Sequence, residues 1–208
     1  MTQFASAAFT GSDAATIQSV DSNWVKAFSS TSDATIKNNR ARMVDAGTNA
    51  AYIYNTAPPS ADYSVSADFY VAGTTSTIMT AWIFARQSAS AVTRYAARWR
   101  NGTGWQLFKY VDGTATQLGS TVTAAYSAGV THTAKLTCNG SAISLHVDGV
   151  LTIGPIADTA ITAAGFGGIV AGSASDTDGV QLDNFSADTL ASDTTIACNQ
   201  GSASAIGY

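Results

Sequence analysis

The sequence predicts an all-β protein folded as an antiparallel β-sandwich. From residue 61 onward, apolar and polar residues alternate with a period of two over most of the chain. Gly, Asn and Asp interrupt these runs at short intervals, as they do in hairpin turns. All 14 acidic residues are aspartates, and a chain without glutamate favours strands and turns over helices.

The first 60 residues have a looser pattern. Short strands are expected near residues 24–28 and 51–54, and the run RARMVDAG that begins at Arg40 could form a helical turn. Residues 61–71, ADYSVSADFYV, then alternate strictly, which predicts a half-buried strand. Its apolar face carries Tyr63, Val65, Ala67, Phe69 and Val71.

The middle of the chain predicts a series of consecutive strands. The run IMTAWIFA, residues 78–85, is apolar on both faces and therefore belongs in the centre of a sheet. RYAARWR, residues 94–100, alternates between an aromatic face and an arginine face. The turn NGTG leads into WQLFKYV, residues 105–111, and Asp112-Gly113 turns the chain again.

The last third of the domain predicts five more strands. Residues 136–154 form three strands joined by hairpins at Asn139-Gly140 and Asp148-Gly149. Expected core residues of these hairpins are Leu136, Ile143, Leu145 and Val147. GFGGIVAG and GVQLDNFSA supply two further strands around the loop SASDTDG, and the glycines of the first are expected to permit close strand packing.

Length and composition define the domain and exclude several classes of protein. A chain of 208 residues suits one domain, which we assign to residues 1–190, followed by a polar, extended C-terminal arm at 191–208. A net charge of −4 argues against nucleic-acid binding, and no apolar run approaches the roughly 18 residues of a membrane span. The N-terminal residues do not have the pattern of a signal peptide. Cys138 and Cys198 could pair or could both be free thiols.

The order of these motifs resembles the concanavalin A-like lectin/glucanase superfamily, and in particular its laminin-G-type jelly roll. HTAKLTCNGSAISLHVDG, GFGGIVAG and GVQLDNFSA resemble the second half of such domains. AWIFARQSASAVTRYAARWRNGTGWQLFKYVDGTATQLG is similar to the family's paired strands with an aromatic–arginine pattern, and FTGSDAATIQSVDSNWVKA resembles the start of such domains in bacteriophage structural proteins. The resemblance implies two curved sheets with a concave face that often meets glycans.

The enzymatic chemistry of that superfamily is not expected here. Its glucanases place two glutamates and an aspartate on one strand, whereas this chain has no glutamate and no matching aspartate run. His132 and His146 are its only histidines, and no Gly-x-Ser-x-Gly elbow accompanies them. We therefore expect no catalytic residue.

Two sets of residues are candidates for ligand binding. Guanidinium groups beside aromatic rings can bind a sugar by stacking and by hydrogen bonds to hydroxyls or carboxylates. The candidate carbohydrate-binding residues are Arg98, Arg100, Trp105 and Tyr110. Alternatively, the arginines pair across strands with aspartates such as Asp62 and Asp68. Asp176 and Asp178 could bind calcium, which laminin-G-type domains often hold at one rim, or could serve only the turn.

The leading functional hypothesis is a non-enzymatic structural protein of a bacteriophage virion, as a capsid decoration or a tail-associated subunit. The architecture is of an extracellular kind without an export signal, and virion proteins are made in the host cytoplasm and released by lysis. Partners would be other virion proteins and copies of the chain itself. The alternative is a carbohydrate-binding module that recognises a host or environmental glycan on its concave sheet. A glycosidase is disfavoured because glutamate is absent.

Overall fold

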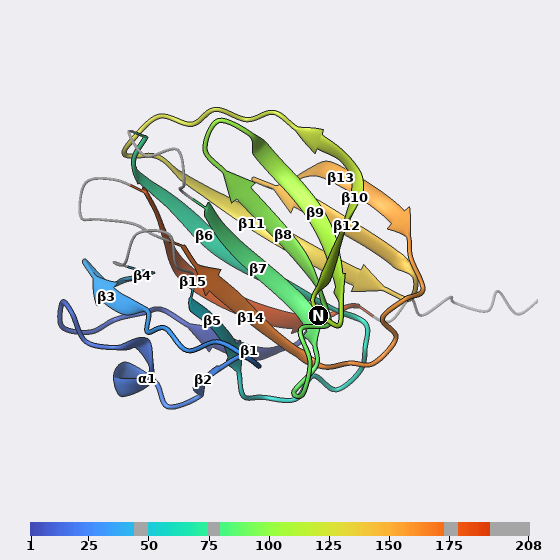
Figure 1. Ribbon diagram of the computed structural model, residues 1–208, viewed down its shortest axis with the longest axis horizontal. Coiled ribbons are helices and arrows are strands. Elements are labelled where there is room, and N and C mark those ends of the chain that lie inside the picture. Colours follow the sequence, from blue (N-terminus) through green and yellow to red (C-terminus); the bar gives the residue numbers. More distant parts are fainter. Residues whose placement is uncertain (44–49, 75–79, 173–178, 192–208) are drawn as a thin grey trace, which may run out of the picture.

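The computed structural model describes residues 1–43, 50–74, 80–172 and 179–191. These residues form fifteen strands and one short helix (Figure 1). The elements are β1 (Gln3–Ala7), α1 (Ile17–Val20), β2 (Trp24–Lys26), β3 (Thr35–Lys37), β4 (Arg40–Arg42), β5 (Ala50–Tyr54), β6 (Tyr63–Gly73), β7 (Thr80–Gln87), β8 (Arg94–Arg100), β9 (Gly104–Val111), β10 (Thr114–Val122), β11 (Thr131–Asn139), β12 (Ala142–Val147), β13 (Val150–Ala157), β14 (Phe166–Ala171) and β15 (Gly179–Thr189). No helix in this part of the chain is long and apolar enough to cross a membrane.

The strands form two antiparallel sheets that pack into a sandwich. Sheet A has the order β13-β12-β11-β6-β15-β4-β3, with β1 also paired to β15, and sheet B has the order β10-β9-β8-β7-β14-β5-β2. In Figure 1, α1, β2 and β3 gather at one edge, away from β10, β12 and β13. The predicted all-β sandwich is confirmed, and β7 lies in the middle of sheet B as its two apolar faces indicate.

Strict alternation along the strands builds the core between the sheets. The inward face of β6 is almost completely buried, from Tyr63 to Val71. The hairpin residues Leu136, Ile143, Leu145 and Val147 are also buried, which confirms their expected place in the core. The loosely patterned N-terminal region contributes Trp24, whose ring packs against Phe9, Tyr54 and Phe185. Burial of such large side chains is the main stabilising contribution to a sandwich of this kind.

The expected helical turn in the run RARMVDAG is wrong for its first residues, because Arg40–Arg42 is strand β4, and residues 44–47 lie outside the described residues. Ala41 pairs with Ile36 of β3 and with Leu182 of β15, and its side chain is fully buried. Pairing with two strands therefore overrides the local preference. Most of the C-terminal arm, residues 192–208, lies outside the described residues, so its extended form stays a prediction.

Cys138 is a buried free thiol on the inward face of β11, and burial raises its pKa to about 12. Because the thiolate is the reactive form, this thiol should resist maleimide at about pH 8 in the folded protein. We expect a Cys198→Ser variant to stay unlabelled for hours by mass spectrometry and to take up one label in denaturant. Labelling of the native variant within minutes would contradict the burial of Cys138.

Candidate functional site: an aromatic–arginine face on sheet B

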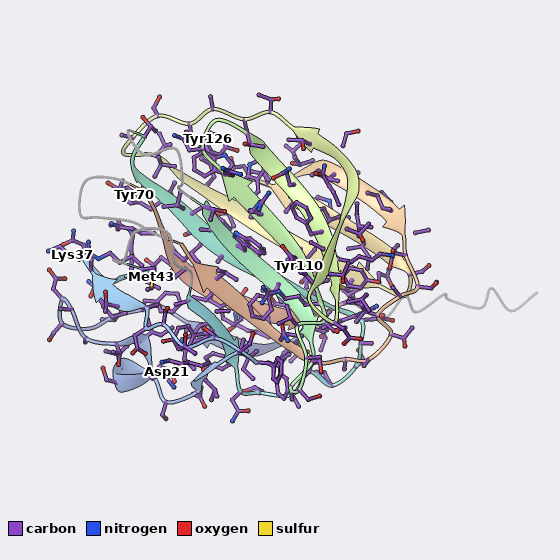
Figure 2. All side chains as sticks on the ribbon, viewed as in Figure 1. Asp21, Lys37, Met43, Tyr70, Tyr110 and Tyr126 are labelled. Atoms are coloured by element: carbon purple, nitrogen blue, oxygen red, sulfur yellow. The ribbon has the colours of Figure 1, made fainter. Side chains whose placement is uncertain are left out.

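The outer face of sheet B carries a second apolar cluster, separate from the core between the sheets. Trp82 and Phe84 of β7 belong to this outer cluster, whereas their neighbours Ala81 and Ile83 belong to the main core. The strand register places side chains of β8 and β9 beside them. We call this surface the aromatic–arginine face, and its residues are Trp82, Phe84, Arg94, Arg98, Phe108 and Tyr110. In Figure 2, Tyr110 marks one end of this sheet, and Tyr126 lies near the opposite end.

Two arginines lie over the rings of this face. The guanidinium carbon of Arg94 is 4.7 Å from the ring centroid of Phe84, 5.3 Å from that of Tyr110 and 5.7 Å from that of Trp82. That of Arg98 lies 5.3 Å from the centroid of Trp82 and also covers Phe108. Cation–π attraction of this kind is strongest for a partly desolvated cation. The arginines therefore form part of the layer that shields the outer aromatic rings from water.

A line of hydrogen-bonding groups crosses the same face from β8 to β10. Arg98 donates from Nε to Oε1 of Gln106 at 3.2 Å and from Nη2 to the same oxygen. The Nε2 of Gln106 donates to Oε1 of Gln117 and to Oγ1 of Thr121, each at 3.1 Å. A ligand on this face would therefore meet amide, hydroxyl and guanidinium groups beside aromatic rings.

The face carries positive charge. Arg94 is only 8% exposed, and burial lowers its pKa to about 10, so the side chain is still protonated near neutral pH. Burial also lowers the pKa of Arg98 and raises that of Tyr110. Arg94 donates from Nη1 to Oε1 of Gln87 at 3.3 Å, but its buried Nε has no acceptor among the described residues.

The structure brings together two of the four predicted carbohydrate-binding residues, Arg98 and Tyr110. Arg100 is exposed at the end of β8, outside the stacked group. Trp105 faces the core instead, because alternation along β9 places it opposite Trp99 and directs its ring inward. Its indole Nε1 donates to the hydroxyl of Tyr126 at 2.6 Å, so Trp105 is not available on the outer face.

Sequence reasoning missed Trp82, Phe84 and Phe108 as surface-layer residues. The spacing of residues along β9 indicates part of this layer, because Phe108 and Tyr110 are two residues apart and therefore lie on the same face of the strand. Trp105 and Tyr110 are five residues apart, and an odd spacing on a strand places them on opposite faces.

The alternative of cross-strand pairing with aspartates applies to a different arginine. Arg86 pairs with Asp62, with Nη2 and Oδ1 3.2 Å apart, and lies almost fully buried at one end of the sandwich. Asp68 instead accepts hydrogen bonds from Thr133 and Asn184. Neither Arg94 nor Arg98 forms an ion pair with an aspartate in the described ranges.

A groove of about 500 Å³ lies on the outer face of sheet A. Its lining residues are Met1, Ser66, Thr133, Lys135, Thr137, His146, Gly149 and Leu190. The Nδ1 atom of His146 is buried there without a hydrogen-bond partner in the described chain. The groove has hydroxyl groups and the ammonium group of Lys135, but no Phe, Tyr or Trp ring on which a sugar could stack.

The calcium prediction falls on Asp176 and Asp178, which lie outside the described residues. Within the described ranges, no group of three or more His, Cys, Asp or Glu side chains could hold a metal ion. Calcium at the SASDTDG loop therefore stays a prediction.

Comparisons with known proteins agree with this architecture. No protein-family model and no curated protein sequence matches the chain. Among solved structures, it is similar to the carbohydrate-binding module CBM66 from Bacillus subtilis, with a TM-score of 0.63 and 14% identity over 80% of this chain and 96% of that one. The potassium-bound carbohydrate recognition domain of Emp46p gives a TM-score of 0.61 at 12% identity, over 91% and 97% of the two chains. The VIP36 exoplasmic/lumenal domain, with Ca²⁺ and Man bound, gives 0.60 at 12% identity over 84% and 86%.

At these identities the likeness concerns the fold alone, an antiparallel jelly-roll β-sandwich that the chain shares with these domains. That part of the resemblance drawn from the sequence is confirmed. Its laminin-G-type and bacteriophage details find no support in these structures.

Proposed function

We propose that this chain is a carbohydrate-binding module whose binding surface is the aromatic–arginine face. The observation that carries the proposal is the position of Arg98 over Trp82 and Phe108. Sugar rings offer C–H groups that stack on aromatic faces and hydroxyls that pair with guanidinium and amide groups, and this face presents both. The solved structures of similar fold support the same class, because their names describe binding of carbohydrate or of Man.

The virion role predicted from the sequence gains no support from these structures and stays a prediction. A binding module and a virion subunit are compatible, since a particle protein can carry a glycan-binding face. The non-enzymatic assignment agrees with similar structures that are binding modules and lectin domains.

The proposal predicts that binding depends on Tyr110, whose ring packs with that of Trp82 at a centroid distance of 5.8 Å. On a glycan array, wild-type protein should bind at least one oligosaccharide class. Tyr110→Ala should weaken that binding about tenfold, the equivalent of the roughly 1.4 kcal/mol that one aromatic contact can contribute.

Lys135→Ala serves as the control, because Lys135 lies in the groove on the opposite sheet. We expect its affinity to equal that of wild type. Loss of binding in Lys135→Ala with retention in Tyr110→Ala would move the site to the groove. If the folded wild-type protein binds no glycan at all, the proposed function is wrong.

A further inference from the structure

The aromatic–arginine face contains cations that the described chain does not neutralise. Both guanidinium groups lie within 6 Å of one indole ring, that of Trp82 (5.7 Å for Arg94 and 5.3 Å for Arg98). Four other basic side chains of the described chain pair with aspartates, in the ion pairs Lys26–Asp33, Lys37–Asp13, Arg86–Asp62 and Lys109–Asp158. Among the described residues, Arg94 and Arg98 are the only two cations that lie against the same aromatic ring, and neither of them pairs with a carboxylate.

This arrangement is costly for the protein on its own. An arginine as buried as Arg94 is normally paired, because desolvation penalises an uncompensated charge. Its only described acceptor is the neutral amide oxygen of Gln87, and its Nε has none. An anion bound between the two side chains would supply both the missing acceptor and the missing negative charge.

The more exposed member of the pair is placed to make the direct contact. Arg98 uses Nε and Nη2 for Gln106, and its Nη1 makes no hydrogen bond within the described residues. The planar guanidinium is well suited to an oxyanion such as a carboxylate or a sulfate. Arg94 lies deeper, against Phe84, and adds its charge from below the surface.

We infer that the saccharide recognised by this face is acidic, and that its carboxylate or sulfate group binds between Arg98 and Arg94. The inference rests on the proposed function and specifies its ligand class. The sugar ring would stack on the exposed part of Tyr110, while its anionic group pairs with the guanidinium groups. A neutral sugar would leave the two charges uncompensated and would bind more weakly.

The test is an array of oligosaccharides in matched pairs. One pair is tetragalacturonic acid and its methyl ester, which share a backbone and differ in charge. A second pair is a sulfated galactan oligosaccharide and its desulfated form. Wild-type protein should bind the charged member of at least one pair ten or more times better than its neutral partner, and the pair that responds identifies the anion. Raising sodium chloride from about 50 to 500 mM should weaken this binding, as expected for an exposed charge contact.

Arg98→Gln should lose at least tenfold in affinity for the charged saccharide and little for its neutral partner. Lys135→Gln removes one positive charge from the opposite sheet and should bind as wild type does. Arg94→Lys should also weaken acidic ligands, and its melting temperature is measured to separate binding from folding.

The outcomes distinguish the inference from the proposed function. Equal binding of charged and neutral partners, unaffected by Arg98→Gln, would overturn the acidic-sugar inference and leave a carbohydrate-binding module. Absence of binding to every saccharide on the array would overturn both.

Discussion

Replacing Arg86 with alanine should lower the free energy of unfolding by about 3–5 kcal/mol, because it removes the buried donor for three backbone carbonyls and for the half-exposed carboxylate of Asp62. The guanidinium donates from Nε to the carbonyl oxygen of Ala61 at 2.9 Å and from Nη1 to that of Ile161 at 2.6 Å. Nη2 donates to the carbonyl of Gly140 at 2.9 Å and to Asp62 at 3.2 Å. One side chain thus joins three loops at one end of the sandwich.

The backbone of Arg86 is also held in place by its surroundings. Its φ of 56° lies in the left-handed region, which is unfavourable for a residue with a Cβ atom. Its amide also donates to the hydroxyl of Tyr63, a side chain from the facing sheet. An alanine at this position would keep the unfavourable φ but lose the side-chain hydrogen bonds, so the strained backbone would no longer be offset by those bonds.

Urea unfolding followed by tryptophan fluorescence measures this effect, with Arg100→Ala as the control. Arg100 is an exposed arginine one strand away, and its removal should change the free energy of unfolding by no more than about 0.5 kcal/mol. If Arg86→Ala loses less than about 1 kcal/mol, the contacts of Arg86 do not hold the end of the sandwich together.

Much of the fold follows from local pattern. The alternating runs of β6, β8, β11 and β12 indicate which side chains face the core, and Asn-Gly and Asp-Gly mark the hairpins between β11, β12 and β13. These features depend on residues close in sequence, so one chain is enough to predict them.

The remaining features depend on contacts between distant residues. Arg86 bonds to positions from 24 to 75 residues away, so no pattern of neighbouring residues indicates these contacts. Strand β1 pairs with β15, which lies near the other end of the sequence. Neither the length nor the composition of β1 indicates that partner. The candidate site was half predictable. Arg98 and Tyr110 follow from the alternating pattern. The outward position of Trp82 does not, because β7 is apolar on both faces and only its register with β8 shows which face Trp82 lies on.

Gly168→Ala should destabilise the protein by about 3 kcal/mol, at the upper end of the usual cost of overpacking. Gly168 lies on the outer face of β14, paired with Ile53 on one side and with Phe84 on the other. A Cβ atom there would overlap the carbonyl oxygen of Tyr52 and would lie 2.5 Å from the ring atom Cζ of Phe84. The backbone oxygen cannot move without disturbing the pairing of β14 with β5, so the strand itself must shift.

The adjacent residue supplies the matched control. At Gly167 an added Cβ would lie 2.9 Å from a methyl group of Val65, and its next neighbours are 3.7 Å away or more. A valine side chain can yield where a strand carbonyl cannot, and alanine also lowers the entropy of the unfolded chain. Gly167→Ala should therefore cost at most about 1 kcal/mol. Thermal unfolding of the two variants should separate them by several degrees, since about 1 kcal/mol shifts the midpoint of a domain of this size by 2–4 °C. Equal midpoints would show that β14 and β5 can move apart freely.

The two variants should also differ in glycan binding. Because Phe84 lies directly under Arg94, a shift of β14 in Gly168→Ala should weaken glycan binding, whereas Gly167→Ala should bind as wild type does.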